Sequence, residues 1–148
     1  MEILNRKARH DYFIEETYEC GIELMGTEVK SIRKGSCNIR DSYARIKNNE
    51  IFLINMFINH YKEGNIFNHD ETRSRRLLLH KNEIIKISKM VELQGLTLVP
   101  LKVYFVRGRV KVLLGIARGK KNYDKRESLK QEDLKRQMAK AVKYKGVN

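Results

Sequence analysis

The sequence predicts a mainly β fold: an OB-like antiparallel β-barrel of about six strands, with short flanking helices and a disordered basic C-terminal tail. Three observations support this prediction. Short runs rich in β-branched and aromatic residues recur along the chain, separated by glycine and asparagine. Only residues 81–94 have a sustained helical period. After residue 117 the chain becomes strongly basic and has too few apolar residues to build a core.

The first part of the chain is expected to form two strands, residues 10–18 and 22–25, joined by a bend at 19–21. Residues 59–75 have no clean period and are predicted to form a long loop, a type of segment that is often functional. The apolar run that starts at Leu77 follows it as a buried strand or the approach to a helix.

Two helices are expected. Residues 27–34 place apolar residues on one face, with Thr27 as the N-cap and Gly35 ending the helix in a left-handed conformation. Residues 81–94 have the stronger helical spacing, and Gly95 ends the pattern.

Two hairpins are expected. Residues 42–46 and 51–57 flank Asn48-Asn49, and asparagine tolerates the positive φ of a tight turn. Residues 96–106 and 110–117 form the strongest hairpin pattern, joined by Arg107-Gly108-Arg109. Its first strand contains Pro100, which requires an edge position or a bulge because proline has no N–H.

The charge of the chain favours a polyanionic partner. The chain has 31 Lys and Arg against 18 Asp and Glu, a net charge of +13. Residues 1–117 have 20 basic and 14 acidic residues, whereas residues 118–148 have 11 and 4. Nucleic acid is the first candidate, since each neutralised phosphate releases a counterion, and an anionic membrane surface is the second. No apolar run approaches the length of a transmembrane helix, so no membrane insertion is expected.

Three basic segments are candidate nucleic-acid contacts. Residues 5–10 offer lysine and arginine, but the same residues are typical of a solvated terminus. Residues 71–76 hold three arginines, which we interpret as a loop stabilised by ion pairs, with Asp70 and Glu71 as local partners. In residues 117–126, a single aromatic residue, Tyr123, stands among cations with no core to join, so stacking on a base is its predicted use.

No catalytic pattern is evident, so we expect a binding protein without a cofactor or metal. The four histidines are scattered, and neither a phosphate-binding glycine loop nor a nucleophile motif occurs. Glu19 could accept a hydrogen bond from a guanine or cytosine amino group, or it could simply order the bend. Cys20 and Cys37 are too few for a disulfide framework and are predicted to be reduced. The N-terminus has no apolar signal segment, so a cytoplasmic location is expected.

Together, these motifs resemble the SmpB family, the tmRNA-binding proteins of bacterial ribosome rescue. The matching segments occur in order along nearly the whole chain: NRKARHDYFIEETYECGIEL, GTEVKSIRKG, NIRDSYARI, RSRRLLLHKNEI, GLTLVPLKVYF and KVLLGIARGKKNYDKRE. The resemblance implies an OB-like barrel with accompanying helices and an RNA-binding function without enzymatic activity.

The resemblance also implies the partners. Residues 1–117 would form the body that binds the tRNA-like domain of tmRNA, and elongation factor Tu would accompany the complex to stalled ribosomes. Residues 118–148 would form a tail that is disordered when free and helical in the decoding site and mRNA channel of the ribosome. The implied tmRNA-binding residues are Asn5, Arg6, Lys7, Arg9, Glu19, Leu78 and His80. The implied ribosome-facing residues are Arg118, Lys120, Lys121, Tyr123, Asp124, Lys125 and Arg126.

Two other classes remain open from the residues alone. An RNA-modifying or metal-dependent hydrolase would need His, Asp or Glu side chains converging in a pocket. A general structured-RNA or single-strand-binding OB protein would need rows of exposed aromatic side chains. Aromatic residues make up 8% of the chain and tryptophan is absent, so most rings are expected in the core.

Overall fold

The structure, a computed structural model, describes residues 1–63 and 68–120 of the chain. The described elements, in chain order, are β1 (Glu2–Leu4), α1 (Arg6–Asp11), β2 (Tyr12–Ile22), α2 (Gly26–Arg33), β3 (Cys37–Asn38), β4 (Tyr43–Lys47), β5 (Glu50–Ile54), β6 (Phe57–Ile58), β7 (Arg75–Leu78), α3 (Lys81–Gln94), β8 (Thr97–Val106) and β9 (Arg109–Gly119).

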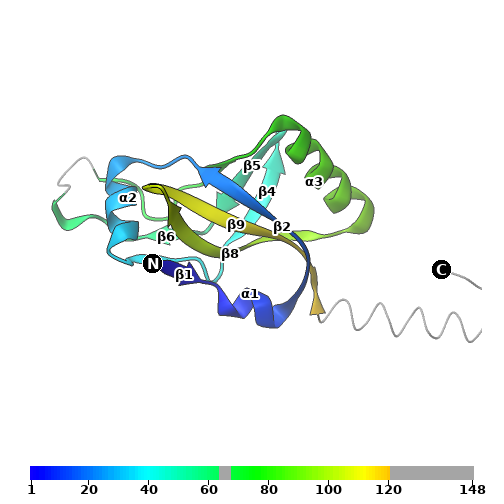
Figure 1. Ribbon diagram of the computed structural model, residues 1–148, viewed down its shortest axis with the longest axis horizontal. Helices are drawn as coiled ribbons and strands as arrows, with labels where there is room; N and C mark the ends of the chain where they lie inside the picture. Colours follow the sequence, from blue (N-terminus) through cyan, green and yellow to red (C-terminus); the bar gives the residue numbers. More distant parts are fainter. Residues whose placement is uncertain (64–67, 121–148) are drawn as a thin grey trace, which may run out of the picture.

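Six strands close into an antiparallel barrel (Figure 1). Hydrogen-bonded neighbours follow the order β8, β4, β5, β7, β2 and β9, and β9 pairs with β8 to complete the ring. β1 also pairs with β8, and β3 pairs with β6 as a separate two-stranded ribbon. Closing the barrel pairs the edges that an open sheet would leave exposed. The predicted mainly β, OB-like fold is therefore confirmed.

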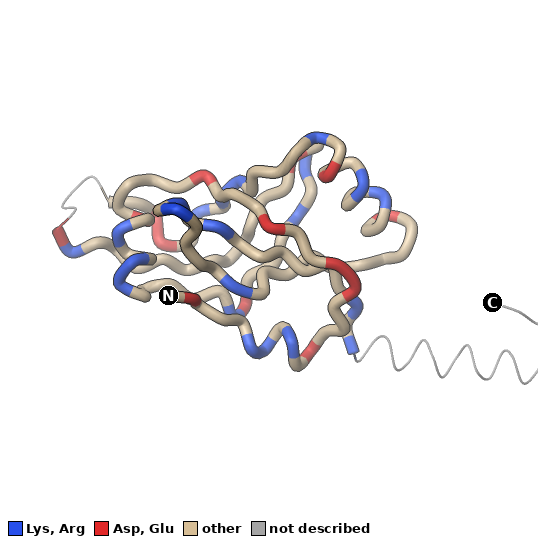
Figure 2. The backbone as a smooth tube through the Cα atoms, viewed as in Figure 1, with Lys and Arg blue, Asp and Glu red and all other residues tan. Residues whose placement is uncertain are grey.

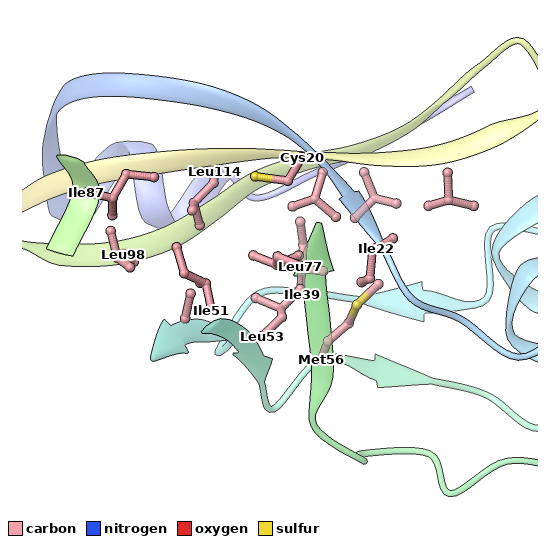
Figure 3. Packing of buried hydrophobic residues seen from close by; sticks show 14 of the residues in the cluster. Cys20, Ile22, Ile39, Ile51, Leu53, Met56, Leu77, Ile87, Leu98 and Leu114 are labelled. Atoms are coloured by element: carbon pink, nitrogen blue, oxygen red, sulfur yellow. The ribbon is translucent and has the colours of Figure 1, made fainter. Parts of the chain in front are cut away.

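The main core lies inside the barrel and beneath α3 (Figure 3). Cys20, Ile51, Leu77 and Leu114 come from four different strands, and Ile87 comes from α3; all five are fully buried. The strand residues meet because alternate side chains of a strand point to the same face. Cys20 and Cys37 are free thiols, as predicted, and burial raises the pKa of each to about 12.

Both predicted hairpins are confirmed. β4 and β5 are joined at Asn48 and Asn49, whose φ angles are 51° and 61°. β8 and β9 are joined at Arg107 and Gly108, whose φ angles are 51° and 79°. Two consecutive positive φ angles characterise the turn whose twist matches that of the flanking strands, and asparagine and glycine adopt them at least cost.

Pro100 lies at a β-bulge, one of the two positions predicted for it. The pairing register with β9 shifts between Pro100 and Lys102, which makes Leu101 the extra residue. Leu101 packs with Ala8 of α1 in a second, smaller core. The bulge also anchors the chain before α1, because the backbone N–H of Asn5 donates to the carbonyl of Leu101 at 2.9 Å.

The two predicted helices are confirmed as α2 and α3, with one correction. Gly35 and Gly95 follow them with φ angles of 74° and 63°, in the left-handed region that favours glycine. The prediction that Thr27 caps α2 is wrong. Met25 occupies the N-cap position, and its backbone N–H donates to the Glu28 carboxylate at 2.7 Å.

The predicted bend at residues 19–21 is also wrong. β2 runs without interruption from Tyr12 to Ile22. Cys20 and Gly21 stay in register with Val112 and Lys111 of β9, so the ladder hydrogen bonds hold the glycine in the strand. The only register shift along this pair lies between Ile14 and Glu16, nearer the start of β2.

Two further differences concern the ends of the body. The sequence predicts only a basic segment at residues 5–10 and a strand from residue 10, but residues 6–11 form α1. β9 was expected to end at residue 117, yet it continues to Gly119, because Arg118 and Gly119 pair with Phe13 and Tyr12 of β2. β9 therefore ends beside α1 (Figure 1).

Candidate nucleic-acid interface

Three of the residues implied as RNA-binding line a single groove of about 770 Å³: Glu19, Leu78 and His80. β2, the end of β7, the start of α3 and the β8–β9 turn surround this groove, and the turn region contributes Arg109 and Lys111. Two carboxylates, those of Glu19 and Glu83, therefore share one surface with an imidazole, an exposed aliphatic side chain and two cations. This combination suits a ligand that carries both phosphates and base edges.

Leu78 forms an apolar patch in this groove. Its side chain is 44% exposed at the end of β7, and its Cα lies opposite that of Gly21 in β2. A Cβ added to Gly21 would come within 3.2 Å of the Leu78 Cβ, closer than nine in ten real Cβ contacts. The missing side chain at Gly21 thus makes room for the leucine.

His80 is fixed at the N-terminus of α3. It is the N-cap residue, and its backbone N–H donates to the Glu83 carboxylate at 3.0 Å. A negative charge in the first turn also complements the helix dipole. The exposed His80 side chain is therefore held on an ordered backbone at the edge of the groove.

Glu19 is exposed on β2, and its carboxylate accepts a hydrogen bond of 2.6 Å from the Tyr104 hydroxyl of β8. Burial and this carboxylate raise the pKa of Tyr104 well above its ordinary value, so the phenol remains a donor at neutral pH. Sequence reasoning missed Tyr104 and Lys111. A two-residue turn at 107–108 fixes the register of the hairpin and sets Tyr104 opposite Lys111. The position of this turn in the sequence could therefore have identified both residues as neighbours.

Asn5 is buried and is used within the fold. Its side-chain amide donates to the carbonyls of Ile39 and Pro100, at 3.0 and 2.9 Å, and its side-chain oxygen accepts from the Ala8 N–H at 3.1 Å. Both amide protons are thus occupied, and the oxygen caps α1. The structure gives Asn5 the role of fixing α1.

The three other implied residues near the N-terminus lie on α1 and are exposed: Arg6, Lys7 and Arg9. Figure 2 shows the resulting concentration of positive charge on this helix. Lys7 pairs with Asp41 at 3.0 Å, whereas Arg6 and Arg9 have no ion pair with any residue that the structure describes. Arg6 and Lys7 border a second hollow, which shares no lining residue with the groove.

Of the implied ribosome-facing residues, only Arg118 and Lys120 are described. Arg118 lies in β9 and pairs with Glu15 of β2 at 3.1 Å, and it also donates to the Gln94 side chain at 3.2 Å. Arg118 is therefore part of the folded body, contrary to the expected start of the tail. The Lys120 ammonium lies 5.2 Å from the centre of the Phe13 ring. The others lie outside the described residues: Lys121, Tyr123, Asp124, Lys125 and Arg126.

The arginines of residues 71–76 are held by ion pairs, as predicted, but the carboxylates of these pairs are not those of Asp70 and Glu71, which offer Arg75 only their backbone carbonyls. Arg73 and Arg75 both donate to the Glu28 carboxylate of α2, at distances down to 2.6 Å. Glu28 and Arg75 have no solvent exposure. Arg76 pairs with two further glutamates, one preceding α2 and one in β5. Nothing in the sequence singles out Glu28, whose partners are more than forty positions away.

His69 is likewise used in the fold, and it is buried. Its Nε2 lies 2.9 Å from the Ile58 carbonyl, which can only accept, so Nε2 carries a proton. Its Nδ1 lies 2.9 Å from the Thr27 hydroxyl. Within residues 1–63 and 68–120, no three His, Cys, Asp or Glu side chains are grouped as a metal site would require. None of the helices in the same ranges is long and apolar enough to cross a membrane.

A closed antiparallel barrel with a mixed polar groove and a basic helix has the features of OB-like nucleic-acid-binding proteins. Residues 2–144 match the family model described as SmpB protein, and the chain belongs to this family.

Similar proteins agree with this family. The chain is 59% identical over 139 residues to an SsrA-binding protein of Clostridium botulinum strain Hall, covering 94% of this chain and 89% of the relative. It is 60% identical to an SsrA-binding protein of Clostridium acetobutylicum, covering 94% and 90%. A solved structure titled "tmRNA-SmpB: a journey to the center of the bacterial ribosome" contains a chain with 54% identity and a TM-score of 0.68, covering 80% of this chain and 84% of that one.

Proposed function

We propose that this chain binds tmRNA and acts in trans-translation as a binding protein, without catalysing a reaction. The observation that carries the proposal is the 54% identity, over 80% of the chain, to a protein whose structure is titled for tmRNA, SmpB and the bacterial ribosome. The names of the clostridial relatives support an RNA partner. The basic surface of the body, with a net charge of +6 over residues 1–117, supports a polyanionic ligand.

Within this proposal, the groove and α1 bind the tRNA-like domain of tmRNA. Glu19, Leu78 and His80 contact bases, because they combine an acceptor, an apolar surface and an imidazole in one groove. Arg6 and Arg9 contact phosphates, since both guanidinium groups are exposed and unpaired among the described residues. Lys7 binds a phosphate in place of its partner Asp41 when the RNA is bound. Asn5 holds α1 in position and does not contact the RNA.

Binding measurements test this part of the proposal. The tRNA-like domain should bind at least about tenfold more tightly than an unstructured RNA of equal length at the same salt concentration, a difference of about 1.4 kcal/mol. Leu78→Ser should weaken binding of the tRNA-like domain. Ile85→Ser is the matched control, because Ile85 is a similarly exposed aliphatic residue on α3, at 47%, that does not line the groove. Equal affinity for the two RNAs would refute tmRNA recognition.

The second part of the proposal concerns the tail and the ribosome. The protein delivers tmRNA to stalled ribosomes together with elongation factor Tu, in the cytoplasm. The residues after Gly119 then enter the vacant decoding site and mRNA channel, with Tyr123 stacking on a ribosomal base and Lys120, Lys121, Asp124, Lys125 and Arg126 contacting ribosomal RNA. Arg118 anchors the tail to the body, which its pairing with Glu15 supports.

A protein that ends at Lys120 tests the division of labour between the body and the tail. It retains every strand of the barrel, including the two last residues of β9. We expect it to bind the tRNA-like domain nearly as tightly as the full chain but to lose tagging of nascent chains on stalled ribosomes. Tagging at the full-length rate by this shortened protein would contradict a role for the tail.

A further inference from the structure

Four side chains form a continuous chain of contacts across the outer surface of the barrel. Glu2 of β1 pairs with Lys102 of β8 at 3.0 Å. The Lys102 ammonium lies 4.9 Å from the centre of the Tyr104 ring, and the Tyr104 hydroxyl donates to the Oε2 of Glu19 at 2.6 Å. These contacts connect β1 at one edge to β2, across β8 and β9.

The strand registers explain why the tyrosine can reach the glutamate. Tyr104 pairs with Lys111 of β9, and Glu19 pairs with Leu113, two residues further along the same strand. Tyr104 and Glu19 are therefore diagonal to one another across β9. The long aromatic side chain spans this strand and places its hydroxyl against the carboxylate.

Glu19 has few other constraints. Its side chain is exposed, and it forms no ion pair with any described residue. A glutamate on a strand surface samples several rotamers, and fixing it on binding costs about 0.5–1.5 kcal/mol. Tyr104 has only two side-chain torsions, and its ring lies half-buried between Lys102 and the sheet. The hydrogen bond from this ordered ring can therefore hold Glu19 in one orientation before the ligand arrives.

We propose that Tyr104 is a positioning residue for RNA recognition: it orients the Glu19 carboxylate toward the groove and leaves the second carboxylate oxygen to accept an N–H of a base. Oε2 is occupied by the phenol, so Oε1 is the free acceptor. Tyr104 itself does not line the groove and acts through Glu19. This role rests on the proposed function of the groove as the tmRNA site.

A double-mutant cycle tests the proposal. The affinity for the tRNA-like domain of tmRNA is measured for wild type, Tyr104→Phe, Glu19→Gln and the double variant. Glu19→Gln removes the contact with a base and should weaken binding roughly 5- to 150-fold. Tyr104→Phe removes only the orientation of Glu19 and should weaken binding about 2- to 12-fold. In the Glu19→Gln background, Tyr104→Phe should have no further effect. The salt dependence of binding should stay unchanged in Tyr104→Phe, since no phosphate contact is lost.

Tyr18→Phe is the matched control. Its hydroxyl also donates to a glutamate, Glu16, at 3.1 Å, and neither residue lines the groove. We expect wild-type affinity for this variant. In the free protein, side-chain NMR couplings of Glu19 should indicate one rotamer in wild type and averaging in Tyr104→Phe, which tests the orientation without RNA.

The possible failures are distinguishable. If wild type binds the tRNA-like domain no better than unstructured RNA, the proposed function fails, and the role of Tyr104 fails with it. If wild type prefers the tRNA-like domain but Tyr104→Phe binds equally well, the function stands and the positioning role is rejected. Additive losses in the cycle, or a Glu19 side chain equally ordered in both free proteins, would also reject it.

Discussion

Glu28 connects α2 to the segment before β7, and it does so without solvent contact. Its two oxygens accept from the backbone of Met25 and from the guanidinium groups of Arg73 and Arg75. Burial opposes ionisation of Glu28, but hydrogen bonds from Arg73, Met25 and Arg75 outweigh it, so the pKa of Glu28 is lowered from its ordinary value of 4.5. The carboxylate is therefore a structural anion on which residues 68–75 depend.

Glu28→Gln should destabilise the protein strongly. The change leaves the fully buried Arg75 guanidinium without a compensating charge, and breaking one partner of a buried pair costs about 3–5 kcal/mol. Glu23→Gln is the control, because it removes a single pair with the half-exposed Arg76 and should cost about 1 kcal/mol or less. Urea unfolding curves of the two variants provide the comparison, and equal losses would contradict a special role for Glu28.

The same carboxylate predicts how stability depends on pH. Because the pKa of Glu28 is lower in the folded state, its contribution is fully present above pH 4.5 and is lost as the pH falls through the folded-state value. Wild type should therefore lose stability in this acidic range more steeply than Glu28→Gln. Unfolding free energies measured at several pH values below 5 test this, and parallel pH profiles would refute it.

At the level of elements, Gly115 is the position where β9 passes beneath the bulge of β8. A Cβ at Gly115 would lie 3.0–3.3 Å from the side chain of Leu101, which is fully buried against Ala8 of α1. Gly115→Ala should therefore cost about 1–3 kcal/mol through overpacking. Gly26→Ala is the matched control, since no atom lies within 4 Å of its added Cβ and alanine suits a helix, so stability should be unchanged or rise by up to about 1 kcal/mol.

Thermal unfolding of the two glycine variants measures both effects. Because Leu101 packs against α1, we also expect Gly115→Ala to lower RNA affinity more than Gly26→Ala does. A Gly115→Ala protein as stable as wild type would mean that Leu101 can shift freely, and the close packing of the bulge would not matter.

Prediction from sequence succeeded where an element has its own local signal. Asn48, Asn49 and Gly108 have the backbone preferences of tight turns, and Gly95 ends a helix with clear apolar spacing. Prediction failed where pairing between segments far apart in the sequence determines the local structure. α1 buries only Ala8 and has no periodic apolar face, so its existence depends on the bulge that anchors Asn5. The glycine pattern predicts a break at Gly21, but pairing on both sides keeps this residue in the strand.

At the scale of the molecule, the sequence separates two basic segments that the fold brings together. Residues 5–10 and the end of β9 are more than a hundred positions apart, yet Tyr12, which follows α1, pairs with Gly119. The composition of either segment could not reveal this proximity, because it depends on the register between β2 and β9. Likewise, the joining of Glu19, Leu78 and His80 in one groove depends on β2 pairing with β7.

The charge on α1 predicts a change in salt dependence. Arg6→Gln and Arg9→Gln should each weaken binding of the tRNA-like domain and lower the slope of log K against log salt by about 1, because each removes one phosphate contact. Lys47→Gln is the control, since Lys47 is an exposed cation at the end of β4 that lines neither the groove nor the hollow near α1. A slope equally reduced by all three variants would indicate a general effect of net charge rather than contacts at α1.

The closure of the barrel by β9 has a consequence for the synthesis of the protein. Residues 111–119 of β9 pair with β2, which is made about a hundred positions earlier, and residues 109–117 pair with β8. A growing chain therefore cannot complete its barrel until Gly119 has emerged, whereas the following residues, 120–148, are needed for no pairing described here. The barrel therefore stays open until β9 is made, and β2 and β8, which lie far apart in the sequence, both wait for this one strand.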